Sequence, residues 1–119
     1  MVLTGYIYWV NDDFKYSGER KFSDQFHSVV KIDNVIIEEN AISFDVPEYF
    51  SNGNLCIYKV ALEKKNKRNS YKGAYQELIL NDTGDVTCKL FSNKKQVMLY
   101  GDWIEYGKLY TWWAIIDKT

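Results

Sequence analysis

The sequence predicts an all-β fold, a small antiparallel β-barrel of about eight strands, with a β-sandwich as the alternative. Three observations lead to this prediction. Apolar and polar residues alternate over short runs and do not follow helical spacing. Turn signals separate these runs at short intervals. Aromatic residues, which favour pleated and half-buried surfaces, make up 17% of the 119 residues. We expect residues 1–119 to form one domain, long enough to bury a core without a metal or a disulfide.

The first part of the chain is expected to contain three strands. Residues 5–10 form the first strand, and the polar segment 11–25 is a long loop or a loosely paired hairpin. Residues 26–32 alternate between the two faces of a second strand. Asp33-Asn34 is a turn signal, which leaves 35–37 as a short separate strand.

The middle of the chain predicts a hairpin. Residues 41–46 alternate well, with Ile42, Phe44 and Val46 facing inward. Pro47 is expected to end this strand because proline has no N–H to donate to a ladder. Asn52-Gly53 is a strong hairpin turn. Strands 55–62, 71–80, 86–91, 96–105 and 108–116 follow, with turns at 81–84, 92–95 and Tyr106-Gly107 between the last four.

Glycines lie beside aromatic residues in three of these strands. The sequences are Gly5-Tyr6-Ile7-Tyr8-Trp9, Tyr71-Lys72-Gly73-Ala74-Tyr75 and Tyr100-Gly101-Asp102-Trp103-Ile104-Glu105. A glycine inside a strand often marks a bend, as closure of a small barrel requires. The glycines therefore favour a barrel over a flat sandwich.

In this pattern the chain resembles the calycin-type barrels, the group that contains lipocalins, fatty-acid-binding proteins and avidins. The lipocalin Gly-x-Trp signature is absent, because Gly5 is followed by Tyr6 and Ile7. The resemblance implies the barrel shape and a pocket at its mouth, and no functional residue is carried over from the family.

Charge and composition narrow the classes of partner. The net charge is −1, so no long-range field attracts nucleic acid or anionic lipid. The basic run from Lys64 to Arg68 is interpreted as a solvated hairpin tip, and no glycine-rich phosphate motif occurs. The run 112–116, one of the two longest apolar runs, is far too short to span a membrane as a helix. No basic region precedes the first apolar run, so we expect no signal peptide, a cytoplasmic location and reduced thiols.

Residues that carry chemistry are few. His27 is the only histidine, which excludes a multi-histidine metal site, and we interpret it as a surface residue. Cys56 and Cys88 lie mid-strand and are expected to be structural. Asp102 and Glu105 are three residues apart and point to opposite faces, which makes them a poor acid–base pair. Asp102 either orients a ligand in the lumen or faces water. No cofactor is predicted.

The last two strands are apolar on both faces. Trp112 and Trp113 are adjacent, so they must point to opposite sides, and the sequence leaves open which of them faces inward. The outer face would need a cover, either the 11–25 segment, a second copy or another protein; otherwise a sandwich leaves one tryptophan on a rim. The candidate interface residues are Met98, Tyr100, Trp113 and Ile115.

The function predicted first is that of a non-enzymatic binding protein whose barrel holds a small apolar or aromatic ligand. The candidate ligand-binding residues are Trp9, Tyr75, Trp103, Tyr110, Trp112 and Asp102. The alternative is a protein-interaction or immunity-type module that uses the C-terminal aromatic hairpin as a partner or dimer surface. A small enzyme using Asp102 and His27 is the third hypothesis.

Overall fold

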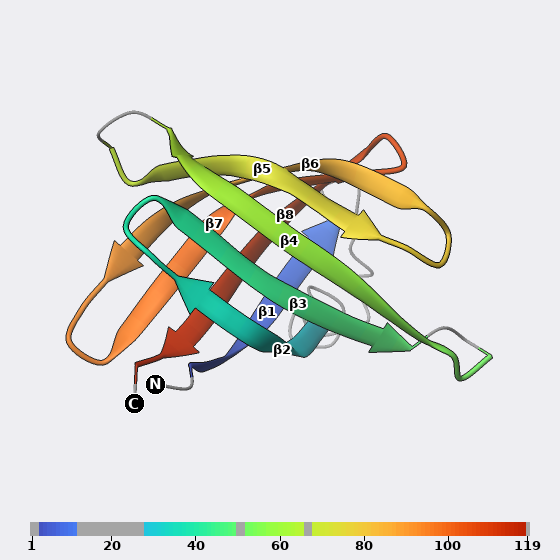
Figure 1. Cartoon of the computed structure of the whole chain (residues 1–119), viewed down its shortest axis with the longest axis horizontal. Coiled ribbons are helices and arrows are strands. Elements are labelled where there is room, and N and C mark those ends of the chain that lie inside the picture. Colours follow the sequence, from blue (N-terminus) through green and yellow to red (C-terminus); the bar gives the residue numbers. More distant parts are fainter. Residues whose placement is uncertain (1–2, 12–27, 50–51, 66–67, 119) are drawn as a thin grey trace, which may run out of the picture.

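The computed structural model describes residues 3–11, 28–49, 52–65 and 68–118, which form a closed antiparallel barrel (Figure 1). Strands follow one another around the barrel in chain order, and β1 closes the ring by pairing with β8. The predicted all-β barrel is confirmed, and the sandwich alternative is wrong because no sheet edge separates two layers. The strands are β1 (Thr4–Asn11), β2 (Ser28–Ile37), β3 (Ala41–Tyr49), β4 (Leu55–Lys65), β5 (Ser70–Glu77), β6 (Asp82–Ser92), β7 (Gln96–Glu105) and β8 (Lys108–Asp117).

Alternation along the strands determines the core. In β3, Ile42, Phe44 and Val46 are buried, as the sequence predicts. In β8, Trp112 and Ile116 are buried, which decides that Trp112 rather than Trp113 faces inward. The described residues contain no helix long and apolar enough to cross a membrane. The predictions for the 11–25 loop, the start of the 26–32 strand and His27 fall largely or wholly on residues outside the described ranges.

The turn predicted at Asp33-Asn34 is wrong. β2 runs through it as one strand, and its register against β3 shifts between Asp33 and Ile36. Asn34 has a φ of 53° and donates a hydrogen bond to Asp45 Oδ2 at 2.8 Å. Asparagine tolerates this left-handed conformation in turns and in bulges alike, so local sequence does not distinguish the two.

The prediction that Pro47 ends its strand is also wrong, because β3 continues to Tyr49. Pro47 lies opposite Ile57 of β4. The pairing of β3 with described residues of β2 stops at Asp45. Beyond Asp45, β3 therefore has a described partner strand on one side only, and a residue without an N–H is tolerated there.

The strand predicted over 71–80 ends earlier, at Glu77. The Glu77 carboxylate is 1% exposed and accepts hydrogen bonds from the backbone N–H groups of Ile79 (2.6 Å) and Leu80 (2.8 Å). These bonds form the turn and leave Leu78, Ile79 and Leu80 exposed. The turn predicted at 81–84 is thus placed too late, because β6 already begins at Asp82. The turn at Tyr106-Gly107 is where the sequence predicts it, with φ values of 50° and 73°.

Glycines permit close approach between neighbouring strands. A Cβ on Gly73 would lie 1.9 Å from the backbone oxygen of Ala61, and one on Gly101 would lie 1.8 Å from that of Thr87. Neither position has room for a side chain. The strand glycines therefore occur where neighbouring backbones come too close for any other residue, as a small closed barrel requires.

We predict that Gly101→Ala lowers the free energy of unfolding by about 1–3 kcal/mol, because the added methyl group must displace backbone atoms of β6. Urea unfolding followed by tryptophan fluorescence measures the change. Asp102→Ala is the matched control, since the Asp102 side chain is exposed on the next residue of β7. Equal stability of Gly101→Ala and the wild type would contradict the role given to this glycine.

Candidate ligand-binding cavity

A cavity of about 260 Å³ occupies one end of the barrel interior. This is the end at which β1, β3 and β7 finish and at which β4 and β8 begin. Aliphatic side chains together with Phe44 and Tyr71 fill the other end. The cavity is lined by residues from five strands: Ile7, Trp9, Val46, Glu48, Tyr49, Tyr58, Trp103, Glu105, Tyr110 and Trp112.

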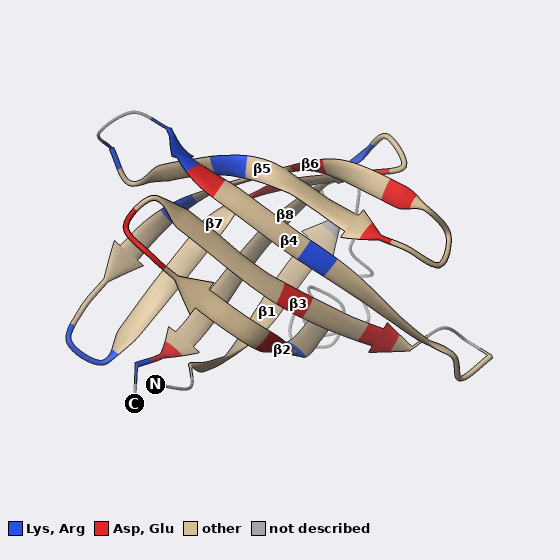
Figure 2. Cartoon of the chain, viewed as in Figure 1, with Lys and Arg blue, Asp and Glu red and all other residues tan. Residues whose placement is uncertain are grey.

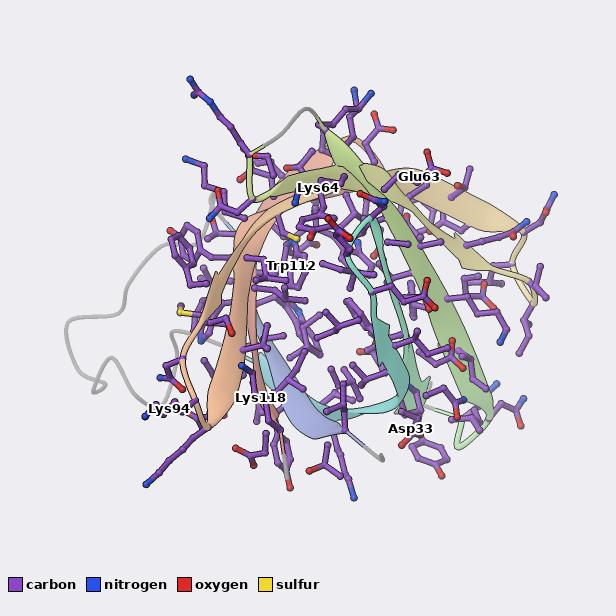
Figure 3. The ribbon with its side chains drawn as sticks, turned by 60° about the vertical axis from the view of Figure 1, so that its left-hand side comes forward. Asp33, Glu63, Lys64, Lys94, Trp112 and Lys118 are labelled. Carbon is purple, nitrogen blue, oxygen red and sulfur yellow. The ribbon has the colours of Figure 1, made fainter. Side chains whose placement is uncertain are left out.

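Trp112 forms the floor of the cavity. Its side chain is fully buried, and Figure 3 shows it inside the ring of strands. Its indole N–H donates to the backbone oxygens of Thr87 (3.2 Å) and Asp102 (3.1 Å). On the side of the filled core, its ring lies 5.9 Å from that of Phe44. The indole therefore separates the packed half of the barrel from the cavity.

Trp103 forms one wall and is held by other rings. It stacks on Tyr75 with a centroid distance of 4.7 Å and an interplanar angle of 13°, and it meets Trp112 edge to face. Tyr58 lies 5.5 Å from Tyr75 and 6.1 Å from Trp103. The Tyr75 hydroxyl donates to Asp82 Oδ2 at 2.7 Å, which fixes the ring behind Trp103. The wall is consequently preorganised.

Two carboxylates, Glu48 on β3 and Glu105 on β7, share the cavity with these rings. Glu105 accepts a hydrogen bond from the Trp103 indole N–H at 3.0 Å and a longer one from the Tyr58 hydroxyl at 3.5 Å. Burial raises the pKa of Glu105, and the negative charges of Asp82 and Glu48 raise it further, against the opposing effect of its two hydrogen bonds. Burial likewise raises the pKa of Glu48.

Among the residues that the structure describes, no lysine or arginine lines the cavity. Lys108 lies across from Glu105 in the β7–β8 pairing, yet the sole ion pair within 4 Å among the described residues joins Lys59 to Asp45 on the outer surface. In Figure 2, basic residues colour the β4–β5 and β6–β7 connections at the opposite end of the barrel, and at the cavity end blue marks the β7–β8 connection, where Lys108 begins β8. The two acids in the cavity are thus left without a compensating cation from the part of the chain that the structure describes.

The structure brings most of the predicted ligand-binding residues together. Trp9, Trp103, Tyr110 and Trp112 line the cavity, and Tyr75 lies directly behind Trp103.

The prediction that Asp102 binds the ligand is wrong. Its side chain is exposed on the outer face, because it precedes the inward Trp103 by one residue. Asp102 and Glu105 do point to opposite faces, as the sequence predicts, and Glu105 is the one that reaches the cavity.

Sequence reasoning missed the two cavity carboxylates as a pair. Glu48 continues the inward series Ile42, Phe44, Val46, but the expectation that Pro47 ends the strand removed it from consideration. Glu105 follows the inward Trp103 by two residues. Extending the alternation to the last residue of each strand would have placed both acids inside the barrel.

The predicted interface residues Met98, Tyr100, Trp113 and Ile115 lie outside the barrel in adjacent pairs. Tyr100 lies opposite Trp113, and Met98 lies opposite Ile115. On the other side of β8, Trp113 stacks on Tyr8 at 5.6 Å and 8°. We call the set Tyr6, Tyr8, Phe91, Met98, Tyr100, Trp113 and Ile115 the outer aromatic face.

Both cysteines are free and buried. Burial raises the pKa of Cys88 to about 12, and burial also raises the pKa of Cys56. Both thiols therefore stay protonated at neutral pH, which suits a structural role. Within the described ranges, no three His, Cys, Asp or Glu side chains gather in a way that could hold a metal ion.

No family model and no curated protein matches this chain. Among solved structures it is similar to a redesigned β-barrel, with a TM-score of 0.58 and 10% sequence identity over 98% of this chain and 89% of that one. At this identity the likeness shows the fold alone. The class it defines is the small closed antiparallel β-barrel, an architecture compatible with calycin-type barrels.

We predict that Glu48→Gln/Glu105→Gln raises the melting temperature at pH 7.5 by a few degrees. The pKa values of both carboxyl groups are raised in the folded state, because burial disfavours their charged form. The free energy of unfolding of the wild type therefore falls as pH rises from the unfolded-state pKa through the folded-state pKa. The gain over the wild type should shrink as pH is lowered towards 4, where the wild-type carboxyls become protonated.

Differential scanning calorimetry across this pH range measures the effect. Asp85→Asn/Asp102→Asn is the matched control, because it removes the same charge from two exposed side chains. A melting temperature that falls at pH 7.5, or a gain that does not vary with pH, would contradict the prediction.

Proposed function

We propose that this chain is a non-enzymatic binding protein that holds a small apolar or aromatic ligand in the cavity of its barrel. The observation that supports this most is the aromatic lining of a preformed cavity of about 260 Å³. An eight-stranded barrel is just wide enough to enclose one small ligand. Cavities built from apolar walls and a few polar groups are the usual form of small-molecule sites.

The rigidity of the cavity supports the same proposal. The rings of Tyr58, Tyr75 and Trp103 pack on one another, and Trp112 is anchored by two backbone oxygens. A ligand that enters such a site does not have to order its walls, so less of the binding free energy is lost. The described residues that line the cavity do not hold a nucleophile beside a base, whereas they do offer the apolar walls and few polar groups of a binding site.

We also propose that the barrel is of the calycin type and that the protein is cytoplasmic. In-order strands around a closed ring and a cavity at one mouth support the first proposal. Two buried free thiols support the second, because thiols persist in a reducing compartment.

A second candidate function uses the outer aromatic face as a surface for a second copy of the chain. The three exposed rings on this face favour it, since Tyr6, Phe91 and Tyr100 are 49%, 49% and 48% exposed. Tyrosine and tryptophan are enriched where binding energy is concentrated in interfaces. This second candidate corresponds to the alternative predicted from the sequence, an interaction or immunity-type module.

We predict that Trp9→Ala weakens the binding of flat neutral aromatics, such as indole or 2-naphthol, by about tenfold or more, because it removes a wall of the cavity. Isothermal titration calorimetry measures the affinity. Trp113→Ala is the matched control, a tryptophan on the outer side of the neighbouring strand. Equal losses in both variants, or binding that neither variant weakens, would overturn the proposed site.

For the second candidate we predict a wild-type dimer in multi-angle light scattering and a monomer for Trp113→Glu, because a buried charge opposes association through this face. The variant should keep the ligand affinity of the wild type, since Trp113 does not line the cavity. A wild-type monomer at high micromolar concentration would rule out the dimer.

A further inference from the structure

We infer that the ligand of the cavity carries a positive charge, as an organic ammonium group joined to a small flat apolar body. This inference rests on the proposed function and specifies the chemistry of its ligand. The observation behind it is that the described residues lining one cavity include several aromatic rings and two carboxylates but no lysine or arginine.

The aromatic walls favour a cation over a neutral head group. Three indole rings, those of Trp9, Trp103 and Trp112, line the same small volume. The face of an indole carries negative potential, and among aromatic side chains tryptophan attracts cations best. Cages of such rings are the usual recognition element for alkylated ammonium groups.

The carboxylates contribute the full negative charge. Glu48 lines the cavity and accepts no hydrogen bond and forms no ion pair with any described residue. A half-buried carboxylate without a partner is costly, and an entering ammonium group would supply one. The same carboxylate would repel an anionic ligand.

Glu105 is held in place for a comparable role. The Trp103 indole donates to Oε1, and the more distant Tyr58 hydroxyl approaches Oε2. Glu105 and Glu48 come from β7 and β3, strands that are not neighbours in the barrel. The two acids therefore approach the cavity from different walls, which suits one cationic group between them better than two separate contacts.

The described residues around the cavity do not offset this negative charge. The charged groups that act most strongly on Glu105 are Asp82 and Glu48, both acidic. Lys108 is the nearest basic residue in the strand pairing and forms no ion pair with Glu105. An organic cation is accordingly the class of ligand whose charge complements the cavity.

Three probes of one shape test the inference: 2-phenylethylamine, 2-phenylethanol and phenylacetate, which carry positive, neutral and negative head groups at pH 7. Their affinities for the full chain are measured by isothermal titration calorimetry at low ionic strength. We expect the amine to bind about tenfold or more tightly than the alcohol, and the carboxylate to bind most weakly.

The variant Glu48→Gln/Glu105→Gln keeps the shape and the acceptor for Trp103 while it removes both charges. It should reduce the preference for the amine over the alcohol to near onefold. The matched control is Asp85→Asn/Asp102→Asn, which changes net charge equally on exposed positions and should keep the preference. Circular dichroism confirms that each variant is folded.

The outcomes separate the inference from the proposed function. Equal binding of amine and alcohol, with both lost in Trp9→Ala, would overturn the cation and leave the binding site standing. A preference for the amine that the control variant also loses would overturn the role of Glu48 and Glu105. If none of the three probes nor the neutral aromatics binds, the proposed function itself is overturned.

Discussion

The contact of the Trp112 indole with the backbone oxygens of Thr87 and Asp102, beside Gly101, is the one on which the rest of this barrel depends. Trp112 and Gly101 lie opposite each other in the β7–β8 pairing, and Gly101 has no room for a Cβ because the backbone of β6 comes too close. The approach that closes the ring leaves the Thr87 and Asp102 oxygens available to the indole N–H. A buried indole needs such acceptors. This contact thus supplies hydrogen-bond acceptors for the indole N–H of the largest buried side chain, and it sets the boundary between the packed core and the cavity.

The interior is organised differently on the two sides of the Trp112 indole. The end of the barrel opposite the cavity is filled mainly by aliphatic residues together with Phe44 and Tyr71, whereas the cavity end is lined by rings that support one another around an open volume. Glu48 and Glu105 add acids whose pKa values are raised by burial, a condition that lowers stability at neutral pH. Proteins keep destabilising groups of this kind mainly where function requires them, so the burial of these acids supports the proposal that the cavity is a binding site.

The adjacent tryptophans of β8 each belong to a different candidate function, and the two functions do not depend on each other. Trp112 reaches the cavity, and Trp113 stacks on Tyr8 on the outer side of the same strand. Because successive side chains of a strand point to opposite faces, a substitution at one can leave the other in place. The C-terminal hairpin is apolar on both faces for two separate reasons, one cavity floor inside and one aromatic surface outside.

By itself the sequence predicted the barrel, most strand positions and four of the six aromatic residues that line the cavity, because alternation, glycines in strands and the Tyr106-Gly107 turn are local signals. It missed Tyr49 and Tyr58. Tertiary structure alone decided the bulge at Asn34, the passage of β3 through Pro47 and the end of β5 at Glu77. Each of these depends on which strand lies alongside and which backbone groups need a partner. For the same reason only the closed ring could show that Trp112 faces inward and that Glu48 and Glu105, distant in sequence, line one cavity.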